Sequence, residues 1–316
     1  LRGRGKVLDR VGSYFGMRKI ETDEKGIRFN NAQFYQKLVL AQNYWPETGL
    51  TMPDEEAGRK DILLAKQAGF NGLRIHQKIE DERFLFFCDT EGLLVWAEYP
   101  ATYEFNDRAI SAIAAEWLEA VRQQYNHPCV IAWVPFNESW GIPNVYTDKL
   151  QQRFTEGIYY LTKAFDAMRP VMCNDGWEHT CSDIVTVHDY DGCVERVNDR
   201  YKNDMKDILD NKIAPTNYRF VMAKGYEYQG QPIVVSEYGG FKLAGTEGWG
   251  YDGEAKDAED LVRKYDKITS AYKKMEKVCG FCYTQLTDVY HETNGLMSFD
   301  RTPKVPLKEI KKINER

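Results

Sequence analysis

The chain alternates short apolar runs with longer stretches in which apolar residues recur every three or four positions. From residue 36 onward, the short runs predict buried strands and the longer stretches predict amphipathic helices. The predicted strands are 36–42, 71–77, 92–98, 129–138, 171–174, 183–190, 232–237 and 280–285. The predicted helices are 54–68, 81–91, 109–125, 146–168, 194–209, 258–277 and 307–314.

Eight apolar strands separated by helices predict an α/β fold, a closed (β/α)8 barrel of parallel strands. The fifth unit is expected to be irregular, because only "DGWEHTCS" separates the strand at 171–174 from the next strand. That spacer is too short for a full crossover helix. No flexible linker or internal repeat follows residue 30, so we predict one barrel domain over residues 31–316.

Residues 1–30 follow a different pattern. The stretch "SYFGMRKIE" alternates as a strand would, and "ETDEKGIRFNNAQFY" is typical of a polar turn followed by a hairpin. Because strands need partners, we interpret residues 1–30 as the tail of a preceding β domain together with the hairpin that leads into the barrel.

Composition excludes some classes of partner. The 316 residues are 43% hydrophobic, which is enough for a sizeable core. The net charge is −6 and no block of basic residues is present, which argues against nucleic acid as a partner. No stretch reaches the roughly 18–20 apolar residues of a membrane span. Seven scattered cysteines favour a reducing compartment, which we take as the cytoplasm, while a secreted or periplasmic location stays open.

The pair of cysteines in "CGFC" has the spacing of a redox or zinc motif. It lies in a predicted strand, where residues three apart point to opposite faces. We therefore interpret both as ordinary core cysteines.

In a parallel barrel the active site lies at the carboxyl ends of the strands, so polar residues that end apolar runs are the first candidates. Those residues are Gln42 and Asn43, residues 74–77, Glu98, Asn137 and Glu138, Asn174 and Asp175, residues 188–190, Glu237, Tyr283 and Gln285.

Two carboxylates dominate this set, since Glu138 ends the fourth predicted strand and Glu237 ends the seventh. Facing carboxylates are what glycosidic bond cleavage needs, because one donates a proton to the departing oxygen while the other stabilises or attacks the sugar carbon. Such a pair is also expected to raise each other's pKa. The alternative for a single glutamate at a strand end is a salt bridge or a helix N-cap.

The motifs "NHPCVIAWVPFNESWG" and "PIVVSEYGG" resemble the acid/base and nucleophile signatures of glycoside hydrolase family 2, the family of β-galactosidases, β-glucuronidases and β-mannosidases. The likeness continues through "GFNGLRIHQKIEDERFLFFCDTEGLLVWAEYP", "NDGWEHTCSDIVTVHDY" and "GFCYTQLTDVYHETNGLMSFDRTPK". It covers nearly the whole chain after residue 30.

The resemblance implies a retaining double displacement on an oligosaccharide or other glycoside. Glu237 would be the nucleophile, Glu138 the acid and then the base, and Asn137 would bind the hydroxyl next to the reacting carbon. The stretch "SYFGMRKIE" resembles the last strand of the immunoglobulin-like domain that precedes the barrel in this family. That implies a sugar-binding jelly roll and an immunoglobulin-like sandwich before this chain; a homo-oligomer stays open.

Six further residues are candidates for contacts with the substrate or the nucleophile, and each could equally have a purely structural role. Arg74 could orient the nucleophile or a substrate hydroxyl, or form a structural ion pair. His188 and Tyr190 lie where the family places polar or aromatic contacts near the nucleophile. The alternative is that both are structural residues whose polar atoms form buried hydrogen bonds. Aromatic rings that could stack on sugars, or simply pack in the core, are Trp140, Trp177 and Tyr283.

The chain departs from its relatives at two motifs. Large bacterial β-galactosidases carry E-T-H after strand three, which holds magnesium, whereas "EYPATYEFND" has no histidine, so we expect neither a metal nor another cofactor. β-Glucuronidases grip the sugar carboxylate with Asn-x-Lys after strand eight, whereas "ETNGLMSFDR" has no lysine. We therefore expect a terminal neutral hexose, with a β-galactoside as the first choice. A β-glucuronidase, a β-mannosidase and a catalytically silent carbohydrate-binding barrel remain the alternatives.

Overall fold

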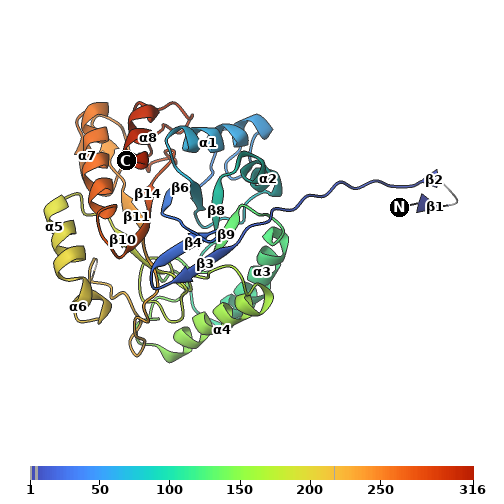
Figure 1. The fold of residues 1–316 in the computed structure, drawn as a ribbon, viewed down its shortest axis with the longest axis horizontal. Coiled ribbons are helices and arrows are strands. Elements are labelled where there is room, and N and C mark those ends of the chain that lie inside the picture. Colours follow the sequence, from blue (N-terminus) through green and yellow to red (C-terminus); the bar gives the residue numbers. More distant parts are fainter. Residues whose placement is uncertain (1, 4–5, 217) are drawn as a thin grey trace.

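The computed structural model describes residues 2–3, 6–216 and 218–316, and its centre is a curled sheet of seven parallel strands ringed by helices (Figure 1). In spatial order the sheet runs β10, β11, β14, β6, β7, β8, β9. The strands are β6 (Gln36–Ala41), β7 (Gly72–Ile75), β8 (Leu94–Glu98), β9 (Val130–Val134), β10 (Val185–Asp189), β11 (Ile233–Gly239) and β14 (Val278–Thr284). The helices are α1 (Glu55–Gln67), α2 (Glu82–Glu91), α3 (Asp107–Gln124), α4 (Lys149–Phe165), α5 (Val194–Asn198), α6 (Met205–Leu209), α7 (Ala258–Tyr272) and α8 (Leu307–Glu315). The parallel α/β arrangement predicted from the sequence is confirmed.

The predicted closed, eight-stranded barrel is wrong in one place, because the sheet stays open between β9 and β10. Residues 171–174, predicted as the fifth strand, form only isolated bridges, such as that between Trp133 and Val171. Their ladder is interrupted because side chains replace backbone partners: the Ser182 hydroxyl accepts from the Cys173 amide at 2.9 Å. The result is a half-barrel whose gap is filled by an irregular segment.

The strands alternate between two cores, as a period of two requires. In β6, Leu38 and Leu40 face the interior of the curled sheet, whereas Val39 and Ala41 pack against the helices. Several helices begin where an Asp or Asn side chain accepts an otherwise unpaired backbone N–H, as Asp54 does from Ala57 at 2.8 Å. The predicted helix 194–209 is divided, because a π-helical turn at Asp199–Asn203 separates α5 from α6.

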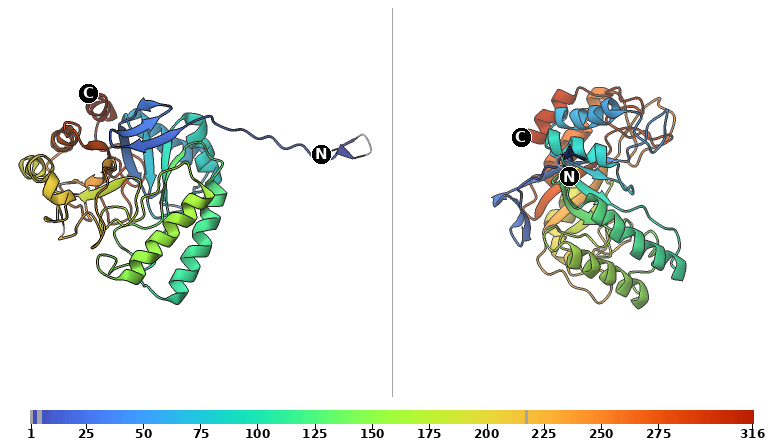
Figure 2. Two further views of the ribbon diagram at one scale, coloured as in Figure 1. Left: turned by 60° about the horizontal axis from the view of Figure 1, so that its bottom comes forward. Right: turned by 90° about the vertical axis from the view of Figure 1, so that its right-hand side faces the viewer.

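A small antiparallel sheet of β3 (Ile20–Asp23), β4 (Gly26–Phe29) and β5 (Ala32–Gln33) precedes the parallel strands, so the predicted hairpin is confirmed. Ile20 and Ile27 insert into the same interior core as Leu38. The hairpin therefore closes the amino-terminal end of the curled sheet, where Figure 2 shows it beside the strands.

The strand predicted at "SYFGMRKIE" is wrong over residues 13–19, which have no strand partner among the described residues. This segment is the base of an arm that extends away from the body of the protein (Figure 1). Arg18 fastens it by donating to the Pro128 carbonyl at 2.9 Å, while Phe15 and Met17 are 83% and 88% exposed. Alternation alone does not make a strand when no backbone ladder lies beside it. Short pairs complete the description: β1 (Arg2–Gly3) with β2 (Lys6–Val7), and β12 (Lys242–Leu243) with β13 (Glu254–Ala255).

None of the helices in the described part of the chain is long and apolar enough to cross a membrane.

Candidate active site

Arg74 is the centre of a buried charged cluster at the carboxyl ends of the strands. It is fully buried on β7, and its Nη1 lies 2.5 Å from Glu237 Oε1. Its Nη2 donates to Asn137 Oδ1 at 2.7 Å and lies 2.6 Å from Glu98 and 2.9 Å from Asp175. Burial opposes the charge, but the carboxylates outweigh it and raise the Arg74 pKa well above its ordinary value. One guanidinium therefore fixes four side chains from different points around the sheet opening.

Glu237 lies near the end of β11 and is only 5% exposed. Its second oxygen accepts from the Tyr190 hydroxyl. Burial alone would raise the Glu237 pKa, but the charges of His188 and Arg74 lower it to about 2. The expectation that the paired carboxylate would raise this pKa is therefore wrong for Glu237, because cations surround it.

Glu138 has a more open and more strained setting. Its side chain is 25% exposed, and Glu138 and Ser139 have φ angles of 52° and 60°, a region that non-glycine residues rarely adopt. The irregular segment holds this turn: the Glu138 amide donates to the Asp175 carbonyl at 2.9 Å, and the Ser139 amide donates to Asn174 Oδ1 at 3.0 Å. The interrupted fifth unit thus aims the Glu138 side chain into the opening.

His188 lies between the two glutamates. Its Nδ1 is 2.8 Å from Glu138 and 3.6 Å from Glu237, and its Nε2 is 3.2 Å from Asp175. Burial disfavours a charged ring, yet the three carboxylates together raise the His188 pKa to about 10. A carboxylate oxygen of Glu138, one of Glu237 and a ring nitrogen of His188 all lie within 4.8 Å of one another. The structure therefore brings together two carboxylates that are 99 positions apart in sequence (237 − 138).

The predicted aromatic residues do not share one place. Trp177 is nearly buried, with its ring centroid 5.5 Å from that of His188, and Tyr190 stacks on Tyr251 at 3.7 Å. Trp140 is 47% exposed at the rim and contacts Tyr103 edge to face.

The structure places Tyr283 elsewhere. Its ring is fully buried between Tyr238 and Tyr265, facing the helices, because Cys282 takes the inward position on β14. A buried ring offers no face to a sugar, so the alternative of core packing describes Tyr283.

Three members of the cluster, Glu98, Asp175 and His76, are among the strand-end candidates of the sequence, but no role was predicted for them. Tyr251 and Glu292 lie in loops after β11 and β14, where no periodic pattern marks them.

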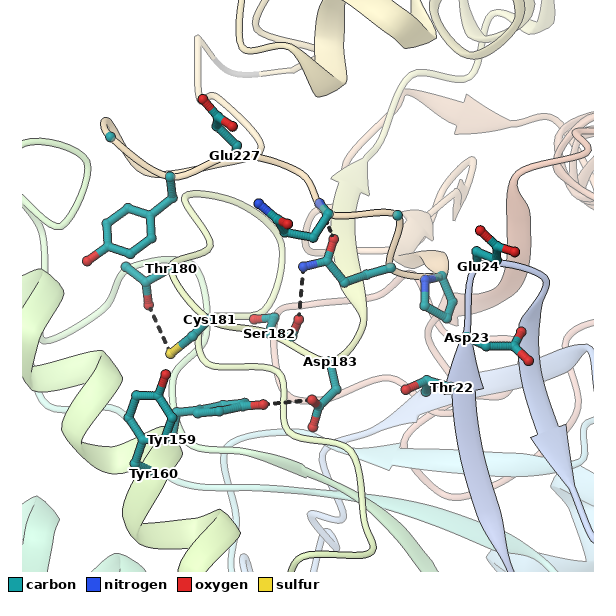
Figure 3. Close-up of a pocket in the computed structure, with 16 residues that line it drawn as sticks. Thr22, Asp23, Glu24, Tyr159, Tyr160, Thr180, Cys181, Ser182, Asp183 and Glu227 are labelled. Atoms are coloured by element: carbon teal, nitrogen blue, oxygen red, sulfur yellow. Dashed lines mark hydrogen bonds between the residues drawn. The ribbon is translucent and has the colours of Figure 1, made fainter.

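Two polar clefts lie at opposite ends of the sheet. One of about 820 Å³ opens at the carboxyl ends of β6, β7 and β8 and is lined by residues that include Gln42, His76 and Tyr103. The other, of about 690 Å³, lies at the amino-terminal ends of β10 and β11, beside the tip of the β3–β4 hairpin (Figure 3). There Tyr159 points to Asp183 and bonds it at 2.7 Å. The two clefts are of similar size, but the one at the carboxyl ends adjoins the charged cluster.

Two groups have metal-ligating side chains close together among the described residues: Glu138 with His188 and Glu237, and Asp89 with His127 and Cys129. In the first, the raised His188 pKa keeps the ring protonated near neutrality, and a protonated ring has no lone pair for a metal.

In the second group, the Asp89 carboxylate already accepts from Tyr14 at 2.6 Å and from the Cys129 amide at 2.7 Å. Burial is the main cause that raises the Cys129 pKa, which disfavours a thiolate. Neither donor set favours a metal in this arrangement.

Known proteins resemble this chain in sequence and in fold. Two curated relatives are β-galactosidases: that of Vibrio cholerae is 30% identical over 191 residues, and that of Lactococcus lactis is 28% identical over 186 residues. These alignments cover 57% and 54% of this chain and 18% of each relative.

Among solved structures, a β-galacturonidase from Eisenbergiella tayi bound to galacturonate superposes with a TM-score of 0.77 at 21% identity. A β-glucuronidase from Ruminococcus gnavus in complex with uronic deoxynojirimycin gives 0.75 at 18%. Each covers 95% of this chain, which spans 55% and 53% of theirs. At such identities these structures establish the shared fold alone. The family described as glycosyl hydrolases family 2, TIM barrel domain, matches residues 20–316, and the chain therefore belongs to that family.

Proposed function

We propose that this chain is the catalytic barrel of a retaining exo-β-glycosidase that removes a terminal β-linked neutral hexose, with a β-galactoside as the best candidate. The observation that carries the proposal is the approach of Glu138 and Glu237 to within 4.8 Å. Carboxyl groups of retaining glycosidases lie about 5–5.5 Å apart, whereas inverting enzymes need roughly 6.5–9.5 Å to admit a water molecule.

The environment of Glu237 suits a nucleophile. The cations Arg74 and His188 keep its carboxylate ionised, with a pKa of about 2, and Tyr190 fixes the second oxygen. In the proposed first step a Glu237 oxygen bonds to the anomeric carbon as the bond to the leaving oxygen breaks, which gives a glycosyl ester.

Glu138 supplies the proton transfers in the proposal. It donates a proton to the leaving oxygen in the first step and removes one from the attacking water in the second. Its side chain is 25% exposed against 5% for Glu237, so water can reach it. Because His188 contacts both glutamates, it can stabilise the Glu138 carboxylate whenever the proton has left.

Asn137 and Arg74 position the sugar in this scheme. Arg74 holds Asn137 Oδ1, which turns the amide nitrogen of Asn137 toward a substrate hydroxyl next to the reacting carbon. Arg74 itself touches the nucleophile rather than solvent, since it is fully buried.

The sugar is proposed from two supports: the curated relatives named above are β-galactosidases, and "ETNGLMSFDR" lacks a lysine for a uronate. The solved relatives that act on uronates keep a β-glucuronidase in view as the second candidate, but they share the fold alone. The jelly-roll and immunoglobulin-like domains stay predictions of the resemblance, and the boundary at residue 30 stays a prediction of the residue pattern.

The test uses the full-length protein and a panel of 4-nitrophenyl β-glycosides. We expect the β-galactoside to be cleaved fastest and the first sugar product to keep the β configuration, as followed by proton NMR during the reaction. An initial α product would contradict the retaining mechanism, and no cleavage of any glycoside would favour a silent binding barrel.

A further inference from the structure

Beside the charged cluster, four polar side chains form a closed ring of hydrogen bonds. Gln42 Nε2 donates to Gln285 Oε1 at 3.0 Å and to Glu292 Oε2 at 2.9 Å. Gln285 Nε2 donates to Asn294 Oδ1 at 2.8 Å, and Asn294 Nδ2 donates to Glu292 Oε1 at 3.2 Å. The ring joins the carboxyl ends of β6 and β14 to the loop that follows β14.

The ring needs an acceptor at position 292. Gln42 donates in both directions, while Gln285 and Asn294 each donate once and accept once. The remaining member must accept twice, which a carboxylate does and an amide in the same place cannot. Each carboxylate oxygen of Glu292 still has a lone pair for another donor.

The ring reaches the cleft through Gln42, the hydrogen-bond partner of Glu292. Gln285 and Asn294 are fully buried, whereas Gln42 and Glu292 are half-buried, and Gln42 lines the cleft together with His76. Burial raises the Glu292 pKa and outweighs the hydrogen bonds from Gln42 and Asn294 and the charge of His76, which lower it; the charge of Glu237 adds a smaller rise.

No lysine or arginine that lines the cleft in the described part of the chain is free to offset this charge. Lys78 is the one lysine or arginine there, and it pairs with Glu80 at 3.0 Å and donates to the Asn43 carbonyl at 3.1 Å. Arg74 is already shared among buried carboxylates. The charge of His76, which also lines the cleft, lowers the Glu292 pKa, but His76 is already paired with Glu98 at 3.0 Å. A sugar that carries its own carboxylate would meet an additional like charge at Glu292, with no unpaired lysine or arginine in the cleft lining to compensate it.

We propose that Glu292 is a specificity-determining residue that accepts a hydrogen bond from a hydroxyl of a neutral sugar and discriminates against a sugar with a carboxylate at that position. The inference rests on the proposed function, and it sets this chain apart from uronate-cleaving proteins of the same fold. Glu292 acts through charge and hydrogen bonding with the sugar and takes no part in bond cleavage.

The experiment measures kcat/KM of the full-length protein for two matched pairs of 4-nitrophenyl β-glycosides: galactoside with galacturonide, and glucoside with glucuronide. Within each pair only the CH₂OH and COO⁻ groups differ. We expect the wild type to prefer the neutral member by at least about 100-fold, and Glu292→Gln to reduce that ratio by about 10-fold or more, equivalent to about 1.4 kcal/mol.

Two further variants serve as controls. Glu292→Asp keeps the charge and should keep the preference for neutral sugars even if its activity falls. Glu119→Gln removes a charge from the exposed face of α3, where the side chain is 72% exposed, and should leave the ratio unchanged. The thermal unfolding midpoint of each variant shows whether it is folded.

A folded Glu292→Gln with an unchanged ratio would overturn the inference, as would a wild type that cleaves both members of a pair equally well. If the wild type cleaves none of the four glycosides, the proposed function fails instead. Calorimetric binding of galactose and galacturonate then decides the inference, which is contradicted if galacturonate binds as tightly as galactose.

Discussion

The two ends of the curled sheet are built from the same strands and have opposite chemistry. At the amino-terminal end, inward side chains such as Leu38, Ile131 and Val234 join Ile20 and Ile27 of the hairpin in an apolar core. At the carboxyl end, the inward positions that follow on β7 and β8 are Arg74 and Glu98. Apolar burial stabilises a fold by about 25 cal/mol per Å², whereas buried charges cost free energy unless they are paired. The apolar amino-terminal end therefore stabilises the fold. The buried charges at the carboxyl end lower the net stability, and in return they form a preorganised cluster.

The clefts at the two ends show that size does not identify a site. They measure about 690 and 820 Å³, and both have carboxylates and tyrosines in their linings. Only the second adjoins carboxylates that share one buried guanidinium. Convergence of carboxylates around a central cation, rather than volume, distinguishes the end at which we propose the active site.

The largest effect is expected from Glu237→Gln at the carboxyl end. The amide is nearly isosteric but cannot form the glycosyl ester, so kcat for the best 4-nitrophenyl glycoside should fall by about 10⁴-fold or more. The fold should persist, because Arg74 keeps Glu98 and Asp175 as partners. Near-normal turnover in a pure preparation would remove Glu237 from the proposed role.

Glu138→Ala is the matched control for that experiment. It removes the proposed proton donor, so substrates with good leaving groups should retain more activity than natural glycosides. Equal losses on both kinds of substrate would argue against Glu138 as the acid.

Arg74→Met tests the cation that the charged end depends on. The change leaves buried carboxylates unpaired, and we expect a loss of about 3–5 kcal/mol in the free energy of unfolding, measured by urea denaturation. Arg122→Met is the control, since Arg122 forms an exposed pair with Glu119 and should change stability by less than about 0.5 kcal/mol. Similar results for both variants would mean that the cluster is not held by Arg74.

Leu38→Ala tests the apolar end. Deletion of this fully buried side chain should cost about 2–4 kcal/mol of unfolding free energy while kcat/KM at 25 °C stays within about twofold of the wild type. Leu150→Ala is the control, because Leu150 is 64% exposed. A large loss of activity in folded Leu38→Ala would show that the two ends are coupled.

The last test varies the pH. The His188 pKa of about 10 lies above its ordinary value, so its contribution to stability is complete below about pH 6.5 and is lost as the pH rises through 10. Glu237, with a pKa of about 2, contributes above about pH 4.5 and loses that contribution as the pH falls through 2. Urea denaturation at pH 7 and pH 10 should show a smaller alkaline loss for His188→Asn than for the wild type. An equal loss in both proteins would contradict the charged His188.

Much of this arrangement could be read from residue order. Apolar runs ending in Glu138 and Glu237 placed both at one end of a parallel sheet, because parallel strands share their direction. Side-chain alternation bears on Tyr283. Neighbouring residues on a strand face opposite sides, and because Cys282 faces inward, Tyr283 faces the helices.

Other features had no local signal. Residues 171–174 are as apolar as a strand, yet their neighbours satisfy the backbone through side chains such as Ser182. Tyr251 and Glu292 belong to loops, whose paths depend on what they pack against rather than on periodicity.

The sequence by itself determined the alternation of strands and helices, the parallel sheet and the end at which Glu138 and Glu237 lie, because side-chain periodicity and strand direction are local properties of the chain. The tertiary structure alone decided the opening of the sheet, the sharing of Arg74 and the contact of His188 with both glutamates. Charges act through space over several ångströms, and the pKa of each group depends on neighbours that are far away in sequence.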